Sequence, residues 1–156
     1  MECECKMETD LNEDEKMNLR IKIIGHAHKL LGIPYKYGAE WTDLTKIPES
    51  LDCTELIEGV YHLVGLKMPD GGMQFSFTVP TSNPKVGDLV FFGRGGKAIE
   101  SQIYHAGLVF DETQIIEARG HQPESNFETG KVILRPRKNW EAYSNFVGYR
   151  SHPRLL

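Results

Sequence analysis

The chain has 156 residues, of which 40% are apolar and 26% are charged, a balance typical of a globular protein with one hydrophobic core. Its formal net charge of −4 gives no basis for nucleic acid or an anionic membrane as the main partner. No apolar run approaches the roughly 20 residues that a membrane-spanning helix needs, so no membrane span is expected.

The beginning of the chain is acidic and lacks the apolar segment of a secretory signal peptide. We interpret residues 1–11 as a flexible leader and residues 12–156 as a single domain, and we expect synthesis in the cytoplasm. Cys3 and Cys5 are one residue apart, but no second cysteine or histidine pair lies near them to complete a metal site. Together with Cys53 they make an odd number, which does not suggest a disulfide framework.

Two helices are predicted in the first half of the chain. Apolar residues recur at helical spacing from about residue 12 to residue 31, and a glycine and a proline then end the segment. A long loop over residues 34–51 leads to the second helix. Asp52 is a good N-cap for that helix, and Glu55 lies three positions later, where a capping box places an acid.

The second half contains short apolar runs between turn residues, which predict strands. Residues 67–81 are interpreted as a loop with at most a short edge strand, and residues 139–143 as a helical turn. The predicted strands cover residues 89–92, 103–110, 114–118, 132–135 and 146–150. Helices followed by a run of antiparallel strands favour an α+β fold with a sheet of about five strands.

Cys53 and His105 are the residues of this sequence that suggest chemistry. Cys53 is expected in the first helical turn, where unpaired N–H groups and the helix dipole favour a thiolate. His105 lies inside an apolar strand, and a buried imidazole needs a partner for each ring nitrogen. If that strand packs against the helix, His105 can take the thiol proton and form a thiolate–imidazolium pair.

A base of this kind usually has a third polar group that fixes its orientation. Glu117 and then His121 are the candidates, because the turn at residues 111–113 makes the two flanking strands a hairpin. Glu117 lies within an apolar run and, as a carboxylate, would support the imidazolium. The alternative for Glu117 is an outward position in contact with solvent.

Short segments spread in order over residues 30 to 150 match a known family. They are residues 32–38, 52–54, 84–92, 105–109, 116–118 and 148–150. In these segments the chain resembles the NlpC/P60 cysteine peptidases of bacterial cell walls. The resemblance implies a papain-like α+β core with helices packed on an antiparallel sheet.

The resemblance also implies roles for individual residues. Cys53 would be the nucleophile and His105 the base, and Glu117 falls at the position of the family's third polar residue. Tyr35 matches a tyrosine whose hydroxyl helps to stabilise the oxyanion, a role that suits a donor aimed at developing negative charge. Asp52 matches an acid that binds the free amine of the substrate in several members.

Three further residues are expected near the substrate. Thr54 stands where serine is usual, and Tyr37 and Trp41 lie in the loop that leads to the nucleophile. This sequence departs from the family's pattern at Glu55, where glycine is usual, and in a longer interval before the nucleophile. The inserted residues 41–50 are expected to border the cleft.

By resemblance, the reaction would be hydrolysis of an amide in a peptidoglycan stem peptide, commonly between γ-linked D-glutamate and a diamino acid. No cofactor is implied, and the scattered histidines show no metal-ligand spacing. Without a signal peptide, release or delivery to the cell wall would follow a non-Sec route. Two alternatives remain: an amidase or acyltransferase with another substrate, and a phage or virion structural module that has kept the fold.

Overall fold

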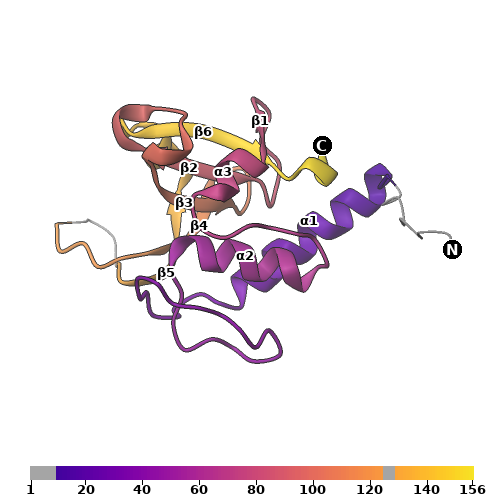
Figure 1. The fold of residues 1–156 in the computed structure, drawn as a ribbon, viewed down its shortest axis with the longest axis horizontal. Coiled ribbons are helices and arrows are strands. Elements are labelled where there is room, and N and C mark those ends of the chain that lie inside the picture. Colours follow the sequence, from indigo (N-terminus) through magenta and orange to yellow (C-terminus); the bar gives the residue numbers. More distant parts are fainter. Residues whose placement is uncertain (1–9, 125–128) are drawn as a thin grey trace, which may run out of the picture.

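The computed structural model describes residues 10–124 and 129–156, and the remaining residues are outside this description. Cys3 and Cys5, and with them most of the predicted leader, therefore lie outside the described residues. Helices come first and an antiparallel sheet of six strands follows (Figure 1), so the α+β prediction is confirmed. Among the described residues, no helix combines the length and the apolar character needed to cross a membrane.

Helix α1 (Glu13–His28) begins with a complete capping box. The side chain of Asn12 accepts the backbone N–H of Glu15 at 2.8 Å, and the Glu15 side chain accepts the backbone N–H of Asn12 at 3.1 Å. The helix was predicted to extend to residue 31, but it ends at His28, and residues 29–32 form turns. The turns lead to Gly32, whose φ of 86° belongs to the left-handed region.

Helix α2 (Cys53–Leu63) has the predicted amphipathic face. Leu56, Ile57 and Val60 are fully buried, and each such side chain stabilises the fold by about 1.5–3 kcal/mol relative to exposure. The helix packs against α1 and against strands β3 (Ile103–Val109) and β4 (Gln114–Arg119). Figure 1 shows α1 and α2 together on one side of the sheet.

The sheet has the strand order β1-β6-β2-β3-β4-β5, and every neighbouring pair is antiparallel. Its strands are β1 (Val79–Thr81), β2 (Leu89–Gly93), β3 (Ile103–Val109), β4 (Gln114–Arg119), β5 (Lys131–Pro136) and β6 (Phe146–Ser151). Five of them coincide with predicted strands. The sixth, β1, pairs with β6 at one edge of the sheet.

The segment before β1 differs from its interpretation as loop or edge strand. Residues Met73–Phe77 form a short helix, α3, and only Val79–Thr81 extends as a strand. Phe75 is buried there, with its ring edge against Phe91 at a centroid distance of 5.3 Å. The alternation of phenylalanines that suggested a strand therefore reflects one turn of helix with one face buried.

Both faces of the central strands are covered. One face packs on α1 and α2, and the other supports a smaller apolar cluster under helix α4 (Arg137–Glu141), centred on Trp140. All five residues of β2 are buried for this reason. The helical turn predicted at residues 139–143 corresponds to α4, which begins two residues earlier at Arg137.

A buried arginine connects the two ends of the described fold. Arg20 of α1 donates from Nη1 to Asp88 Oδ1 at 2.7 Å and to the Val86 carbonyl at 2.9 Å. Its Nη2 donates to the carbonyl of Leu155, in the C-terminal turn η3 (Pro153–Leu155). The first helix, the turn before β2 and the end of the chain therefore converge on one guanidinium.

Candidate active site

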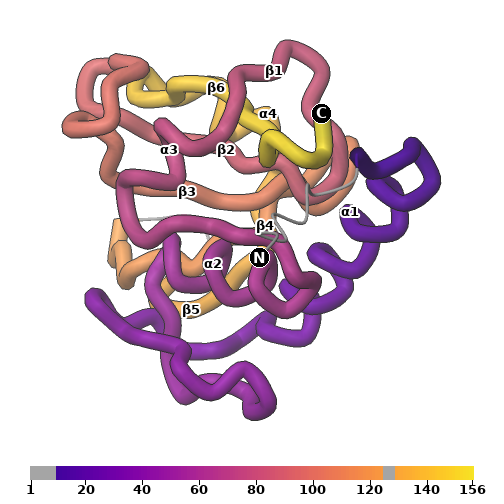
Figure 2. The backbone as a smooth tube through the Cα atoms, turned by 45° about the vertical axis from the view of Figure 1, so that its right-hand side comes forward, coloured from indigo at the N-terminus to yellow at the C-terminus, as the bar shows by residue number. Residues whose placement is uncertain are grey.

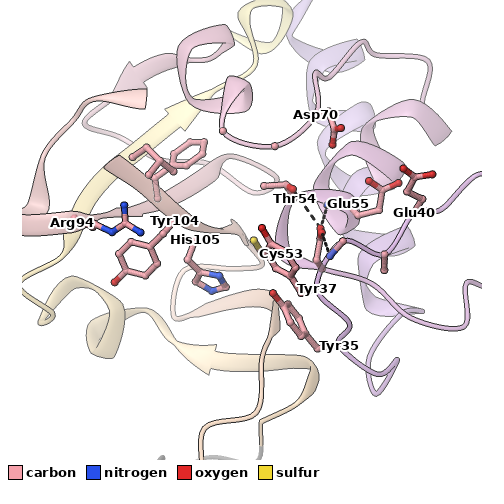
Figure 3. A pocket seen from close by; sticks show the side chains of 17 residues that line it. Tyr35, Tyr37, Glu40, Cys53, Thr54, Glu55, Asp70, Arg94, Tyr104 and His105 are labelled. Carbon is pink, nitrogen blue, oxygen red and sulfur yellow. Dashed lines mark hydrogen bonds between the residues drawn. The ribbon is translucent and has the colours of Figure 1, made fainter. Parts of the chain in front are cut away.

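A cleft of about 560 Å³ lies between the start of α2 and strands β2 and β3. Its walls come from the loop over residues 35–40, residues 52–55, the turn at residues 70–72, and β3 with the neighbouring turn η1 (Arg94–Gly96). Figure 3 shows Cys53 and His105 next to one another in this cleft, one from the helix and one from the sheet. The packing of α2 on β3 thus brings together the two residues that the sequence suggested.

Cys53 is the first residue of α2 and is partly exposed to the cleft. Asp52 is the N-cap, and its Oδ1 accepts the backbone N–H of Glu55 at 2.8 Å. The predicted capping box is only half formed, because the Glu55 carboxylate accepts the backbone N–H of Trp41 at 2.7 Å instead. The N–H of Cys53 belongs to the first helical turn, where donors have no intrahelical acceptor and point towards an approaching anion.

His105 lies on β3 opposite Phe92 of β2, with 11% of its side chain exposed. Its Nε2 is 3.3 Å from Oε2 of Glu117, and its ring stacks on Trp140 at a centroid distance of 5.3 Å. Burial lowers the pKa of His105, but hydrogen bonds to Cys53 and Glu117 and their negative charges outweigh it and raise the pKa to about 9. The imidazole is therefore held as a cation at neutral pH.

Glu117 lies on β4 with no exposed side-chain surface. Burial alone would raise its pKa, but His105, Arg135 and Arg119 hold the pKa below its usual value. Nη2 of Arg135 is 3.2 Å from both carboxylate oxygens, and Nη1 of Arg119 is 3.3 Å from Oε1. The structure therefore places Glu117 inward and not in solvent. His121, the other candidate, is exposed beyond the end of β4.

Tyr35 lines the same cleft and is half-buried. A backbone hydrogen bond to Gly130 at 2.9 Å and a β-bridge to Leu51 hold it in place. Burial and then the negative charges of Cys53 and Asp52 raise the pKa of its hydroxyl. The phenol consequently keeps its proton at neutral pH and can donate a hydrogen bond.

The predicted substrate-binding residues occupy different positions. Asp52 lines the cleft, but its two oxygens already accept from Glu55 and from the backbone N–H of Gly38, the latter at 3.2 Å. Thr54 lines the cleft and donates its hydroxyl to Asp52 at 3.4 Å. Tyr37 stands at the rim with 88% of its surface exposed.

Trp41 does not line this cleft. Its indole N–H donates to the carbonyls of Asp43 and Lys46 at 3.1 and 3.0 Å, and its ring covers Gly59 of α2. The inserted residues 41–50 form an adjoining hollow, and the loop borders the cleft itself only up to Glu40. In Figure 2 this loop extends beyond α2 at the bottom of the molecule.

Sequence reasoning missed a group of three acids, two of which line the same cleft as Cys53. Carboxylate oxygens of Glu55, Glu58 and Asp70 lie within 4.8 Å of one another. Burial, followed by the charges of Glu55 and Asp70, raises the pKa of Glu58 to about 7. The pair Glu55 and Glu58 was visible at helical spacing, but Asp70 comes from a separate turn that no local pattern connects to α2.

Arg135 was also missed, although, like Glu117, it is a charged residue next to apolar residues in a strand. It ends an apolar run in β5, and only 1% of its side chain is exposed. Because a buried guanidinium needs an anionic partner, the two residues could have been predicted to pair. The antiparallel register of β4 and β5, which places Arg135 opposite Ile115, brings them within reach.

An α+β fold in which a helix-borne cysteine meets a strand-borne histidine across an open cleft belongs to the papain-like class. Within that class, the chain belongs to the NlpC/P60 family, whose model matches residues 32–135. It is 33% identical over 100 residues to the probable endopeptidase p60 of Listeria monocytogenes, covering 62% of this chain and 18% of that protein. It is 28% identical over 124 residues to the peptidoglycan endopeptidase RipB of Mycobacterium tuberculosis, covering 73% of this chain and 46% of RipB.

Solved structures show the same fold. RipB from Mycobacterium tuberculosis superposes with a TM-score of 0.65 at 21% identity, covering 90% of this chain and 67% of that chain. The resuscitation promoting factor interacting protein RipA, solved in forms mutated at a cysteine, a histidine and a glutamate, is similar as well. Its glutamate-mutated form gives a TM-score of 0.67 at 18% identity, covering 94% of this chain and 67% of that chain. The chain spans less than half the length of the two curated relatives.

Proposed function

We propose that this domain is a cysteine peptidase that hydrolyses an amide bond in peptidoglycan stem peptides, at the bond between γ-linked D-glutamate and a diamino acid. The observation that carries the proposal is the connected set of Cys53, His105 and Glu117 at an open cleft. A cysteine at a helix N-terminus, hydrogen-bonded to a histidine that a buried carboxylate supports, is the arrangement that nucleophilic catalysis requires.

In the first half of the reaction, the Cys53 thiolate attacks the carbonyl carbon of the scissile amide. Negative charge develops on the carbonyl oxygen, where the Cys53 backbone N–H and the Tyr35 hydroxyl can donate hydrogen bonds. The His105 imidazolium then gives its proton to the leaving nitrogen. The carbon–nitrogen bond breaks, the amine departs, and the acyl group remains on sulfur as a thioester.

In the second half, water replaces the amine in the cleft. His105, now neutral, takes a proton from this water as the oxygen attacks the thioester carbonyl. The carbon–sulfur bond breaks, the carboxylic acid product leaves, and the thiolate–imidazolium pair is restored. Glu117 stays ionised throughout and stabilises each imidazolium state, as its lowered pKa allows.

The charges of the cleft suit a short peptide that carries both amines and free carboxylates. Glu40, Glu55 and Asp70 lie on the side of α2, whereas Arg94 lies on the side of β3 (Figure 3). Arg94 forms no ion pair with any residue in the two described ranges. A carboxylate of the bound peptide can therefore face Arg94 while an ammonium group faces the acids.

The proposal is tested with defined stem peptides and mass spectrometry of the products. The intact protein should yield two fragments separated at the amide between γ-linked D-glutamate and the diamino acid. Cys53→Ala should abolish turnover and leave the circular dichroism spectrum unchanged, because the cysteine is partly exposed and not part of the apolar core. A variant with Cys3→Ser and Cys5→Ser is the matched thiol control and should keep full turnover. Undiminished hydrolysis by Cys53→Ala would end the proposal.

A further inference from the structure

The carboxylate of Glu117 contacts two arginines in addition to His105. It faces His105 from β3, Arg119 on its own strand and Arg135 from β5. Only Oε2 is directed at Nε2 of His105, so the orientation of the carboxylate decides whether that contact exists. A carboxylate without fixed partners could turn away from His105 or take up a proton, and either change would weaken its contact with the imidazole.

Arg135 is more deeply buried than Arg119 and is surrounded by aromatic rings. Its guanidinium carbon lies 4.8 Å from the ring centre of Trp140, 5.5 Å from Tyr143 and 6.0 Å from Phe92. Two of these rings, Trp140 and Phe92, also contact the imidazole of His105. The arginine and the histidine are thus held by one aromatic cluster, with the carboxylate between them.

The two arginines also differ in the oxygens that they contact. Nη2 of Arg135 lies 3.2 Å from both oxygens, including the Oε2 that faces His105. Arg119 reaches only Oε1, is 13% exposed, and uses its Nε and Nη2 to bind Gln122 at 3.1 and 2.7 Å. Arg119 is therefore a natural comparison for the role of Arg135.

We propose that Arg135 is a positioning residue for the reaction, acting only through Glu117: it keeps that carboxylate ionised and turned towards Nε2 of His105, so that the imidazole keeps its orientation in the cleft. This inference rests on the proposed function and adds a residue to its machinery. Loss of the guanidinium leaves Glu117 buried with one fewer cation, which favours the protonated acid. The protonated acid carries no negative charge and is a weaker acceptor, so the imidazolium loses most of its support.

The test is a double-mutant cycle between Arg135→Met and Glu117→Gln, with kcat and KM measured for each variant. Arg135→Met alone should lower kcat about tenfold or more and leave KM within about twofold, because the arginine does not line the cleft. In the Glu117→Gln background the same change should alter kcat by less than about twofold. A loss of equal size in both backgrounds would show that Arg135 contributes only to stability and would overturn the inference.

Two more variants separate charge from geometry. Arg135→Lys keeps the charge but loses the planar group, so it should restore only part of kcat. Arg119→Met removes a cation from the same carboxylate at its more exposed side, and its loss of kcat should be smaller than that of Arg135→Met. Wild-type kcat in Arg135→Met, or a larger loss in Arg119→Met, would contradict the inference.

A readout independent of peptide hydrolysis distinguishes this inference from the proposed function. With Cys3 and Cys5 replaced by serine, the rate of Cys53 alkylation by iodoacetamide is measured at neutral pH, because this reagent reacts with the thiolate that the imidazolium stabilises. Arg135→Met should lower this rate when Glu117 is present and leave it unchanged in the Glu117→Gln background. If stem peptides are not cleaved but this pattern holds, the inference stands and the substrate proposal fails. A wild-type rate of alkylation in folded Arg135→Met and Arg135→Lys would refute the inference about Arg135.

Discussion

The alkaline limit of hydrolysis should depend on Glu117. In the proposed mechanism the leaving amine takes its proton from the His105 imidazolium, so kcat/KM of the wild-type protein should fall as the pH rises through about 9, the raised pKa of His105. Burial lowers this pKa, and the opposing contributions come from Cys53 and Glu117. In Glu117→Gln the contributions from Cys53 remain while the charge of the carboxylate is lost. The alkaline limit should therefore move to lower pH.

The size of the movement follows from the contact between the two side chains. A full negative charge 3.3 Å from Nε2 would be worth about 5 kcal/mol at an effective dielectric constant of about 20. The amide oxygen of glutamine can still accept a hydrogen bond from Nε2, so the variant loses only part of this attraction. We therefore expect the limit to fall by about one to two pH units, as is typical for loss of one close opposite charge.

The assay is kcat/KM for a defined stem peptide between pH 6 and pH 10.5, in wild type and Glu117→Gln. Alkylation of Cys53 by iodoacetamide over the same range is the companion measurement, with Cys3 and Cys5 replaced by serine. Alkylation should not decline above pH 9, because a thiolate needs no proton donor to react with the reagent. Hydrolysis alone should decline. An alkaline limit that stays in place in Glu117→Gln would refute the coupling between Glu117 and His105.

Two further predictions concern stability, both measured by urea unfolding. A Cβ at Gly59 would lie 2.2 Å from the ring of Trp41, so Gly59→Ala should destabilise the fold by about 1–3 kcal/mol. Gly25→Ala on α1 meets nothing within 4 Å and should instead stabilise it by about 0.5–1 kcal/mol; equal effects at the two positions would contradict this reasoning. Arg20→Met leaves the Asp88 carboxylate buried without its partner and should cost about 3–5 kcal/mol. Replacement of both by apolar residues should recover much of this loss, and a double variant as unstable as Arg20→Met would argue against the buried-charge explanation.

The parts of the fold that could be predicted are those in which a local pattern coincides with a buried face. The apolar spacing of α2 and the Asp52 N-cap give the start of the helix correctly, because capping involves only neighbours in sequence. The residues of α3 show the limit of such patterns. Five residues that alternate apolar and polar fit a strand as well as one turn of helix, and only the packing of Phe75 on Phe91 decides between them.

The residues of the candidate site also fall into those that a local pattern predicts and those that depend on contacts between distant segments. Glu117 could be proposed because an acid within an apolar strand needs a buried partner, but the identity of its partners depends on strand register. Glu55 shows how a distant segment overrides a local motif, since its carboxylate accepts from Trp41 and not from the N-cap. Trp41 was expected near the substrate, whereas its ring lies over Gly59 of α2, where a glycine leaves space for it. Contacts of this kind join segments that are far apart in the sequence, so no local pattern predicts them.

The two side chains proposed to react belong to different layers of the molecule, Cys53 to a helix and His105 to the sheet. The separation of sulfur and imidazole is consequently set by side-chain packing between α2 and β3, and no short stretch of backbone fixes it. Mild acid or a low concentration of denaturant can expand such an interior while helices and strands persist. Under those conditions hydrolysis would cease before the far-ultraviolet circular dichroism changes. We therefore expect the proposed turnover to report the packing of the interior, which no probe of secondary structure measures.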